Sequence, residues 1–404
     1  MYGDMNPGID ELLDNPSLRD ALKGKRVAFL GHNASATRDG RFSLDALVEC
    51  DELEITAAFG PQHGFYSEKQ DNMIESQDFI HPIYQIPVFS LYGEVRRPTQ
   101  QMLGTFDVVL IDLQGIGARP YTFMTTLFYM MEACSGTGKG VWVLDRPNPA
   151  GRPVEGPILQ KGFESFVGPG PLVMRHGVTM GELALWYKQE KKLDVDLQVI
   201  EMKDYDQETE PGYGWPAFEL SWINPSPNAS SLNMARCFPG TVLFEGTTLS
   251  EGRGTTTPLE MVGAPGIDFS KILKKMSSLK PDWMKGCTLR LCQFEPTFDK
   301  HRGEICSGVQ IHTDNRYYRH HEFKPYRLGA LLLKAIRLAM PEYPLWRDFE
   351  FEYETERLAI DLLNGSSYLR EWVEDQSTFF SDLDDQLNKD EVRWKEIRKP
   401  FLLY

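Results

Sequence analysis

The chain lacks any cysteine pattern that would indicate a metal site or a framework of disulfide bonds. Six cysteines are scattered over 404 residues, without a C-x-x-C pair. They are Cys50, Cys134, Cys237, Cys287, Cys292 and Cys306. Zinc modules and small disulfide-stapled domains need clustered cysteines, so both classes are excluded. Scattered free thiols are typical of a reducing compartment, and we expect a cytoplasmic protein.

The marks of membrane insertion, export and nucleic-acid binding are also missing. No stretch has the roughly 18 consecutive apolar residues that a membrane-spanning helix needs. The opening Met1–Pro7 has neither a basic start nor an apolar run, so we expect no signal peptide. The formal net charge of −15 opposes binding to nucleic acid, because phosphates are neutralised by clustered Lys and Arg. We expect no nucleic-acid partner and no membrane partner.

No phosphate-binding fingerprint is present, so we expect no nucleotide cofactor. The first predicted strand is not followed by G-x-G-x-x-G. Gly136–Lys139 resembles part of a phosphate loop, but Gly140 stands where Ser or Thr is needed, and a strand follows it. We expect no metal either, because no required ligand spacing links the residues that could bind one. These residues are His63, Asp112, Asp145 and His176.

The pattern of the first half is that of a doubly wound α/β domain. With 404 residues, of which 41% are apolar and 25% charged, the chain is long enough for two domains. Helices are predicted between several short apolar strands, and such alternation indicates a mostly parallel sheet. The strands are predicted at Arg26–Leu30, Glu54–Phe59, Pro87–Leu91, Asp107–Asp112 and Val141–Asp145. The helices are predicted from Asn15 to Gly24, at Leu44–Cys50 with Ser43 as cap, at Tyr121–Ala133 and at Thr179–Lys191.

The second half predicts a smaller α/β unit. A strand at Asp196–Glu201 is followed by Pro211–Pro239, a segment without clear period that we interpret as a long ordered connection. Further on, the pattern predicts two strands, an apolar helix and an acidic helical tail packed on the outside. They lie near Cys287–Phe294, Gly308–Thr313, Pro325–Met340 and Glu354–Tyr404. We therefore place residues 1–235 in an N-terminal domain and 236–404 in a C-terminal one.

Three of the predicted strands run into loops rich in chemically able side chains. Gly60–Asn72 contains Gln62, His63 and Glu68, a mixture of imidazole, amide and carboxylate. Since the carboxyl ends of parallel strands share one edge of the sheet, these loops are expected to meet around one pocket. Amides, charges and aromatic rings together suit a sugar, although a structural turn with a satisfied histidine explains the first loop equally well.

The second and third loops offer several candidates. Asp112 ends a strand and Arg119 precedes a helix, so Arg119 either clamps a substrate carboxylate or pairs with Asp112. The rigid Asp145–Pro149 either lines the pocket or only supports it. Thr179 and Glu182 form a capping box, which makes Glu182 structural rather than catalytic.

Two later segments have the same polar character. Asn224–Asn228 carries two amides between prolines, and Glu245–Thr257 combines glycines, hydroxyls, carboxylates and an arginine. Glycines let a backbone approach a ligand closely, and successive amide groups can form an anion-binding nest. For Glu245–Thr257, we favour a role in binding a ligand over a purely structural role.

Taken together, these segments resemble the NamZ-type exo-β-N-acetylmuramidases, a bacterial glycoside hydrolase family. The likeness runs from Gly8-Ile9-Asp10 to the strand at Gly308–Thr313, over most of the chain. The motifs that carry it are Gly60–Gly64, Ser90–Glu94, Asp112–Tyr121, Leu144–Pro149, Val154–Pro157, His176–Thr179, Pro225–Asn228 and Glu245–Thr257. The resemblance implies a Rossmann-like domain, a smaller domain and an active-site cleft between them.

The implied activity is release of N-acetylmuramic acid from the non-reducing end of peptidoglycan fragments, so the expected partner is a sugar or muropeptide. Its lactyl carboxylate suits Arg119 or Arg253, and its N-acetyl group suits Asn228 or backbone amides. The catalytic residues are expected to be His63, Glu68 and Asp112. Those expected to bind substrate are Gln62, Gln114, Arg119, Tyr121, Arg146, Asn148, His176, Asn228, Glu245, Glu251 and Arg253.

One residue departs from the family pattern. Many members have Glu between Pro and His of the first loop, and this chain has Gln62, whose amide cannot exchange a proton as a carboxyl group does. Either Glu68 or Asp112 takes the acid role, or the activity is changed or lost. The alternatives are a non-catalytic protein that binds amino sugars and, disfavoured by the missing phosphate fingerprint, a transferase that uses an activated sugar. A cytoplasmic enzyme would act on imported fragments during cell-wall recycling.

Overall fold

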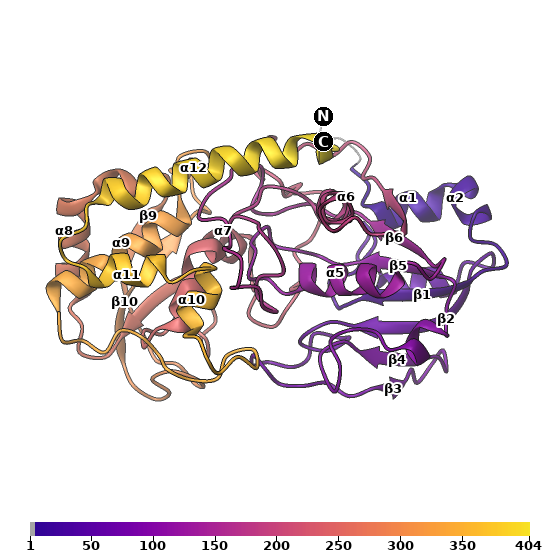
Figure 1. The fold of residues 1–404 in the computed structure, drawn as a ribbon, viewed down its shortest axis with the longest axis horizontal. Coiled ribbons are helices and arrows are strands. Elements are labelled where there is room, and N and C mark those ends of the chain that lie inside the picture. Colours follow the sequence, from indigo (N-terminus) through magenta and orange to yellow (C-terminus); the bar gives the residue numbers. More distant parts are fainter. Residues whose placement is uncertain (1–4) are drawn as a thin grey trace.

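The computed structural model describes residues 5–404 and confirms the α/β fold with a mostly parallel, Rossmann-like sheet (Figure 1). Seven strands lie in the spatial order β3-β4-β2-β1-β5-β6-β7. Every neighbouring pair is parallel except the antiparallel pair of β3 and β4. The strands are β1 (Arg26–Gly31), β2 (Glu54–Gly60), β3 (Phe79–Ile80), β4 (Pro87–Ser90), β5 (Val108–Asp112), β6 (Gly140–Leu144) and β7 (Asp196–Ile200).

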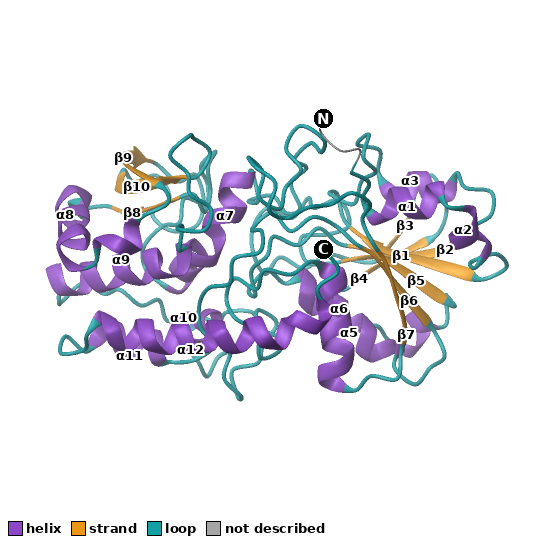
Figure 2. Ribbon diagram, turned by 90° about the horizontal axis from the view of Figure 1, so that it is seen from above, coloured by secondary structure: helices purple, strands orange, loops and turns teal. Residues whose placement is uncertain are grey.

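Helices cover both faces of this sheet because its strands are apolar on both sides. In β1, Val27 and Phe29 belong to one buried cluster, and Ala28 and Leu30 belong to another. Figure 2 shows α1 to α3 on one face of the sheet, and α5 and α6 on the other. The helices of this part are α1 (Gly8–Asp14), α2 (Pro16–Asp20), α3 (Ser43–Val48), α4 (Gln100–Leu103), α5 (Phe123–Cys134) and α6 (Met180–Lys191).

Of the three helix N-caps predicted from the sequence, two are confirmed and one is wrong. The Asn15 side chain accepts a hydrogen bond from the Ser17 amide and caps α2. Thr179 and Glu182 form the predicted capping box of α6. Ser43 does not cap α3, because it is the first residue of the helix and Phe42 occupies the N-cap position; its hydroxyl donates to Asp112 Oδ2 at 2.6 Å.

A second, antiparallel sheet of three strands in the order β8-β10-β9 organises the C-terminal half. The two strands predicted here correspond to β9 and β10, whereas the short strand β8 was not predicted from the sequence. The connection predicted at Pro211–Pro239 is wrong in its last part, since α7 begins at Leu232 and contains Pro239. The elements are α7 (Leu232–Thr241), η1 (Val242–Gly246), β8 (Met261–Ala264), α8 (Phe269–Leu279), η2 (Pro281–Met284), β9 (Thr288–Phe294), β10 (Cys306–His312), α9 (Pro325–Ala339), α10 (Ala359–Asn364), α11 (Tyr368–Glu374), α12 (Phe380–Arg398) and η3 (Lys399–Phe401).

The predicted helical tail is present, and its last helix, α12, runs along the molecule from the small sheet to the large one (Figures 1 and 2). Trp394 of α12 is fully buried and packs edge-on against Trp186 of α6, with ring centroids 5.2 Å apart. Arg327 of α9 forms an ion pair with Glu391 of α12. The tail therefore ties the two halves together. The domain boundary between residues 235 and 236 stays a prediction, and it falls within α7.

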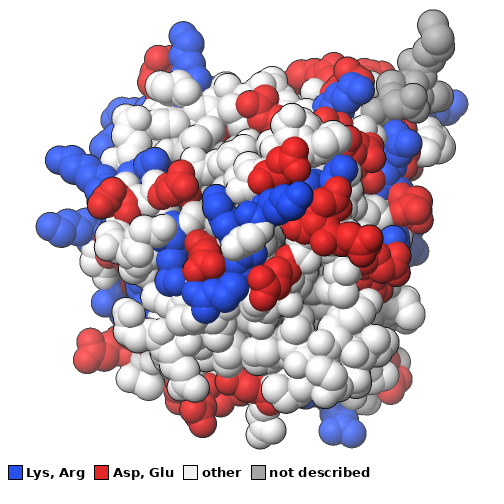
Figure 3. Space-filling model, turned by 90° about the vertical axis from the view of Figure 1, so that its right-hand side faces the viewer, with Lys and Arg blue, Asp and Glu red and all other residues white. Residues whose placement is uncertain are grey.

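In residues 5–404, no helix combines the length and the hydropathy that crossing a bilayer requires. Met1–Asp4, part of the segment from which we expect no signal peptide, lie outside the described residues. Figure 3 shows the end of the molecule at the right of Figure 1, where Lys and Arg side chains lie among Asp and Glu side chains. Neither sign of charge dominates that face.

Candidate functional site

A polar pocket lies where loops of the large sheet meet loops of the C-terminal half. Its lining surrounds about 500 Å³ of empty space, including the mouth that opens to solvent. The polar lining residues are Gln62, His63, Asn72, Tyr121, Thr122, Ser226, Asn228, Glu245, Arg253 and Glu352. Six of these ten were predicted as site residues from the sequence: Gln62, His63, Tyr121, Asn228, Glu245 and Arg253. As predicted, these residues come from remote segments of the chain and line one pocket.

His63 enters the pocket directly after β2 and is held as a neutral ring. It has a left-handed backbone with φ of 73° and is almost completely buried. Nδ1 lies 2.8 Å from the Lys69 carbonyl oxygen, which can only accept, so Nδ1 carries the ring proton. Burial lowers the pKa of His63 to about 4, and the charge of Arg253 adds to this effect. Nε2 is therefore an unprotonated nitrogen at neutral pH.

Gln62 belongs to a buried hydrogen-bond network that joins both halves of the chain. Its Oε1 accepts a hydrogen bond of 2.6 Å from the Thr122 hydroxyl, and its Nε2 donates one of 2.9 Å to Glu352. The other carboxylate oxygen of Glu352 accepts from the Tyr92 hydroxyl at 2.8 Å. Burial raises the pKa of Glu352 above its ordinary value. The amide of Gln62 is thus oriented from both sides, with a carboxyl group in direct contact.

Arg253 supplies the positive charge of the pocket. It lies between Gly252 and Gly254, both with positive φ, of which Gly254 packs closely against the backbone of Phe298. Its Nη2 donates to Glu245 at 2.6 Å, whereas Nη1 is buried and has no hydrogen-bond partner among residues 5–404. The glycines thus serve close contacts within the chain, and the guanidinium retains an unused donor.

A second cation balances the carboxylates behind Arg253. Lys300 Nζ lies 2.5 Å from Glu251, which also lies 3.1 Å from Arg253 Nε. Burial favours the neutral form of Glu251, but Lys300 and Arg253 outweigh it and hold its pKa below the ordinary value. Glu251 does not line the pocket and acts as a buried counter-ion of Arg253. Its predicted role in binding substrate is corrected accordingly.

An apolar wall faces these charges. Tyr121 lies edge-on against Phe238 of α7, with ring centroids 5.8 Å apart, and Phe351 approaches from the C-terminal half. Asn228 also lines the pocket; its Nδ2 donates to the Gln70 carbonyl at 2.8 Å, and its Oδ1 accepts from Gln70 Nε2 at 3.3 Å. Aromatic faces beside amides and charges are typical of sites that hold a sugar ring.

Two of the three predicted catalytic residues lie elsewhere. Glu68 is exposed, accepts a hydrogen bond from the Tyr66 amide and faces a different surface hollow beside Phe79. Asp112 is fully buried below the pocket and forms a bidentate ion pair with Arg146. Since neither carboxylate lines the pocket, neither is placed to act on a ligand there.

Arg119 is a structural residue. Its guanidinium is fully buried and donates to four main-chain carbonyl oxygens, at Pro157, Leu172, Leu363 and Asn364, over 2.6–3.0 Å. Both readings of Arg119 from the sequence were wrong, because it neither faces the pocket nor pairs with Asp112. It joins the end of α10 to loops of the N-terminal half.

The third strand-end loop supports the site without lining it. Arg146 is paired with Asp112, and Gln114 donates to the carbonyl of Pro147 at 2.8 Å. Asn148 closes its own turn by donating to the Gly151 carbonyl at 3.1 Å. Arg146 and Asn148 border a neighbouring hollow, which shares Tyr121 with the main pocket, and Arg146 borders a further hollow together with Gln114. Their polar groups are used in these internal bonds, and their contacts with substrate stay a prediction.

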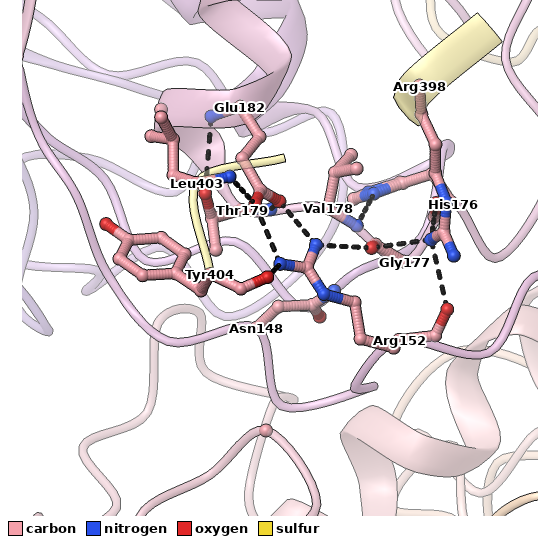
Figure 4. Close-up of polar contacts among 12 residues, drawn as sticks. Asn148, Arg152, His176, Gly177, Val178, Thr179, Glu182, Arg398, Leu403 and Tyr404 are labelled. Carbon is pink, nitrogen blue, oxygen red and sulfur yellow. Dashed lines mark hydrogen bonds and ion pairs between the residues drawn. The ribbon is translucent and has the colours of Figure 1, made fainter. Parts of the chain in front are cut away.

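His176 lies in the anchor of the C-terminal tail (Figure 4). Its Nδ1 accepts from the Val178 amide at 3.3 Å, and its carbonyl accepts from Arg398 at 3.1 Å. Burial, assisted by the charge of Arg398, lowers the pKa of His176 to about 3. Next to it, Glu182 forms a bidentate ion pair with Arg152 and accepts from the Leu403 amide. His176 thus lies outside the main pocket and borders the same neighbouring hollow as Arg146 and Asn148.

Four lining residues were not named as site residues from the sequence: Asn72 and Ser226, which lie within two of the polar segments, and Thr122 and Glu352. Glu352 lies in a loop without motif, 290 positions from its partner Gln62, and no local spacing connects the two. Asn72 donates to Glu245 at 3.3 Å and was passed over within the first loop. In residues 5–404, no three His, Cys, Asp or Glu side chains are grouped as a metal site would need.

Comparison with known proteins yields matches over the whole length. Models described as exo-β-N-acetylmuramidase NamZ, N-terminal and C-terminal, match residues 27–233 and 236–404. The chain is 36% identical over 398 residues to the peptidoglycan β-N-acetylmuramidase NamZ of Bacillus subtilis (strain 168). That alignment covers 98% of this chain and 91% of the relative.

Two solved structures share the fold. Both are DUF1343 family proteins from Bacteroides fragilis. One has a TM-score of 0.83 at 25% identity and covers 99% of each chain. The other has a TM-score of 0.74 at 26% identity and covers 100% of this chain and 99% of its own.

Proposed function

This chain belongs to the exo-β-N-acetylmuramidase NamZ family, and on that premise we propose that it releases N-acetylmuramic acid from the non-reducing end of peptidoglycan fragments. It is a glycoside hydrolase that acts on peptidoglycan, as the 36% identity over nearly the whole chain supports.

The observation that carries the proposal is the unused donor of Arg253. N-acetylmuramic acid differs from N-acetylglucosamine by a lactyl ether that ends in a carboxylate. A guanidinium binds a carboxylate with parallel hydrogen bonds, and the bonds are strong where water is excluded. Arg253 is buried, lines the pocket and has Nη1 without a partner among the described residues. It is the residue that we assign to the lactyl group.

The remaining lining suits the other parts of the sugar. Tyr121 and Phe238 present an apolar wall for a ring face, and Asn228 offers an amide for the N-acetyl group. Neutral His63 offers Nε2 as the acceptor for a proton of water. Of the three catalytic residues expected from the sequence, we retain only His63.

A second candidate function is binding of the same sugar without turnover. Gln62 favours it, because an amide stands where the resemblance to the family leads us to expect a carboxyl group. In this case the protein would hold muropeptides through Arg253 and Asn228 and leave the glycosidic bond intact.

Two measurements separate the candidates. Hydrolysis of a chromogenic β-N-acetylmuramide and of the matching β-N-acetylglucosaminide is followed between about pH 4 and 9, where a glycosidase with an acid and a base is expected to work. Calorimetry then measures the affinity for free N-acetylmuramic acid. Turnover of the muramide alone supports the hydrolase, tight binding without turnover supports the second candidate, and neither signal contradicts both.

The role of Arg253 has its own control. Arg253→Lys retains the charge but loses the bidentate geometry, so we expect about 10- to 100-fold weaker binding of N-acetylmuramic acid. Arg302→Lys changes an exposed arginine and is expected to leave the affinity unchanged. Equal affinities for all three proteins would remove Arg253 from the lactyl site.

A further inference from the structure

We propose that Glu352, contributed by the C-terminal half, is the carboxylic acid that donates the proton to the leaving oxygen in glycoside cleavage. The proposal rests on the proposed hydrolase function and names the group that the first loop lacks. Glu352 lines the pocket, with 7% of its surface exposed, and contacts the side chain of Gln62 at 2.9 Å. Its carboxyl group thus lies one hydrogen bond from the amide of Gln62.

The pocket has two carboxylic acids in its lining, and their surroundings differ. Burial raises the pKa of Glu245 as well, but Glu245 lies 2.6 Å from Arg253, and a proton on it would break this ion pair. Glu352 has no Lys or Arg within 4 Å among residues 5–404, and both of its hydrogen-bond partners are neutral. Only Glu352 can hold a proton without breaking an ion pair.

The groups that face Glu352 leave it protonated at a higher pH than an exposed glutamate. Burial is the largest influence on its pKa and raises it, and the nearby charge of Glu245 acts in the same direction. The hydrogen bonds from Tyr92 and Gln62 and the more distant charge of Arg96 oppose this rise without cancelling it. A general acid needs this property, because it must enter the reaction with its proton in place.

The step balances with the residues of the pocket. Protonated Glu352 transfers its proton to the glycosidic oxygen as the bond from that oxygen to the anomeric carbon breaks. The oxygen of a water molecule bonds to the anomeric carbon, and the proton that this water loses passes to Nε2 of His63. The two sugars leave as alcohols, and the proton returns from His63 to Glu352 through solvent.

Kinetics on two leaving groups test the proposal. Glu352→Gln removes the proton and nearly preserves the shape, and Glu350→Gln alters an exposed glutamate two positions away as the control. A sugar leaving group needs protonation, whereas nitrophenolate hardly does. For Glu352→Gln we therefore expect kcat/KM on the muramyl disaccharide to fall by about 10²–10⁴-fold. On the nitrophenyl muramide we expect a loss below about tenfold, together with the disappearance of the alkaline limb of the pH profile.

Each outcome has one meaning. A selective loss on the disaccharide in Glu352→Gln, with Glu350→Gln like the natural chain, supports Glu352 as the acid. Equal losses on both substrates, or no loss, overturn the proposal while the hydrolase function stands. A natural chain that cleaves neither substrate overturns both. Glu352→Asp, which retains a titratable carboxyl group, should recover part of the disaccharide activity, and it provides the same comparison if Glu352→Gln fails to fold.

Discussion

Replacing His176 by Asn should make the protein less sensitive to acid. In the folded chain the imidazole is neutral, because burial and the charge of Arg398 lower its pKa from 6.5 to about 3. Asn offers an oxygen acceptor for the Val178 amide at the position of Nδ1 but does not titrate. The change therefore removes the proton-binding group and retains the hydrogen bond.

The size of the effect follows from the two pKa values. Between about pH 6.5 and 3 the unfolded chain binds a proton at His176 that the folded chain does not, so stability is lost as the pH falls through this range. From pH 7 to pH 4.5 this linkage amounts to about 2.5 kcal/mol. Relative to the natural chain, His176→Asn should gain about that much free energy of unfolding over the same interval.

Urea unfolding at pH 7, 6, 5 and 4.5, followed by tryptophan fluorescence, measures the difference. Trp394 is a local reporter, since its indole donates to the His176 carbonyl at 2.8 Å. A difference in the free energy of unfolding that stays constant with pH would refute the neutral, buried assignment. Weaker binding of N-acetylmuramic acid by His176→Asn at pH 7 would return His176 to the substrate site.

Three further substitutions test other parts of the structure. Arg119→Gln should lower the free energy of unfolding, measured in urea, by about 3 kcal/mol or more, because buried carbonyl oxygens lose their charged donor. A change below about 1 kcal/mol would contradict the structural role of Arg119. Tyr404→Phe removes the hydroxyl that accepts a hydrogen bond from the Met202 amide at 2.8 Å, and it should lower the free energy of unfolding by about 1 kcal/mol in the same assay. An unchanged urea midpoint would mean that this hydrogen bond of the C-terminal residue does not stabilise the fold. Gln62→Glu places a second carboxyl group beside Glu352 and should raise the pKa of Glu352, so the alkaline limb of the pH profile should move up by about one unit. An unchanged alkaline limb would mean that it does not report the titration of Glu352.

The elements of the large sheet could be predicted from the sequence because their signals are local. A strand such as Val141–Leu144 is apolar at every position since helices cover both of its faces. Asn15 before Pro16 and Thr179 before Glu182 mark helix starts by bonds within a few residues. The cap predicted at Ser43 was wrong because the helix begins at Ser43 itself, where the hydroxyl donates to the distant carboxylate of Asp112.

Part of the candidate site was predictable for a related reason. Gln62 and His63 lie just after a parallel strand, β2. The carboxyl ends of parallel strands lie at one edge of the sheet, independently of the side chains that follow them. Arg253 was found because two glycines and several hydroxyls set its loop apart in composition. Position along the chain was enough to nominate these residues.

Partner choice was decided only by the tertiary structure. Asp112 has both Arg119 and Arg146 near strand ends, and the sequence is silent on which one turns toward it; packing assigns Arg146 to Asp112 and Arg119 to four carbonyls. Glu352 has no motif and reaches Gln62 across 290 positions. Local patterns determine where helices and strands form, but contacts between remote side chains depend on how the two halves dock, and this docking brings the carboxyl group of Glu352 into the pocket.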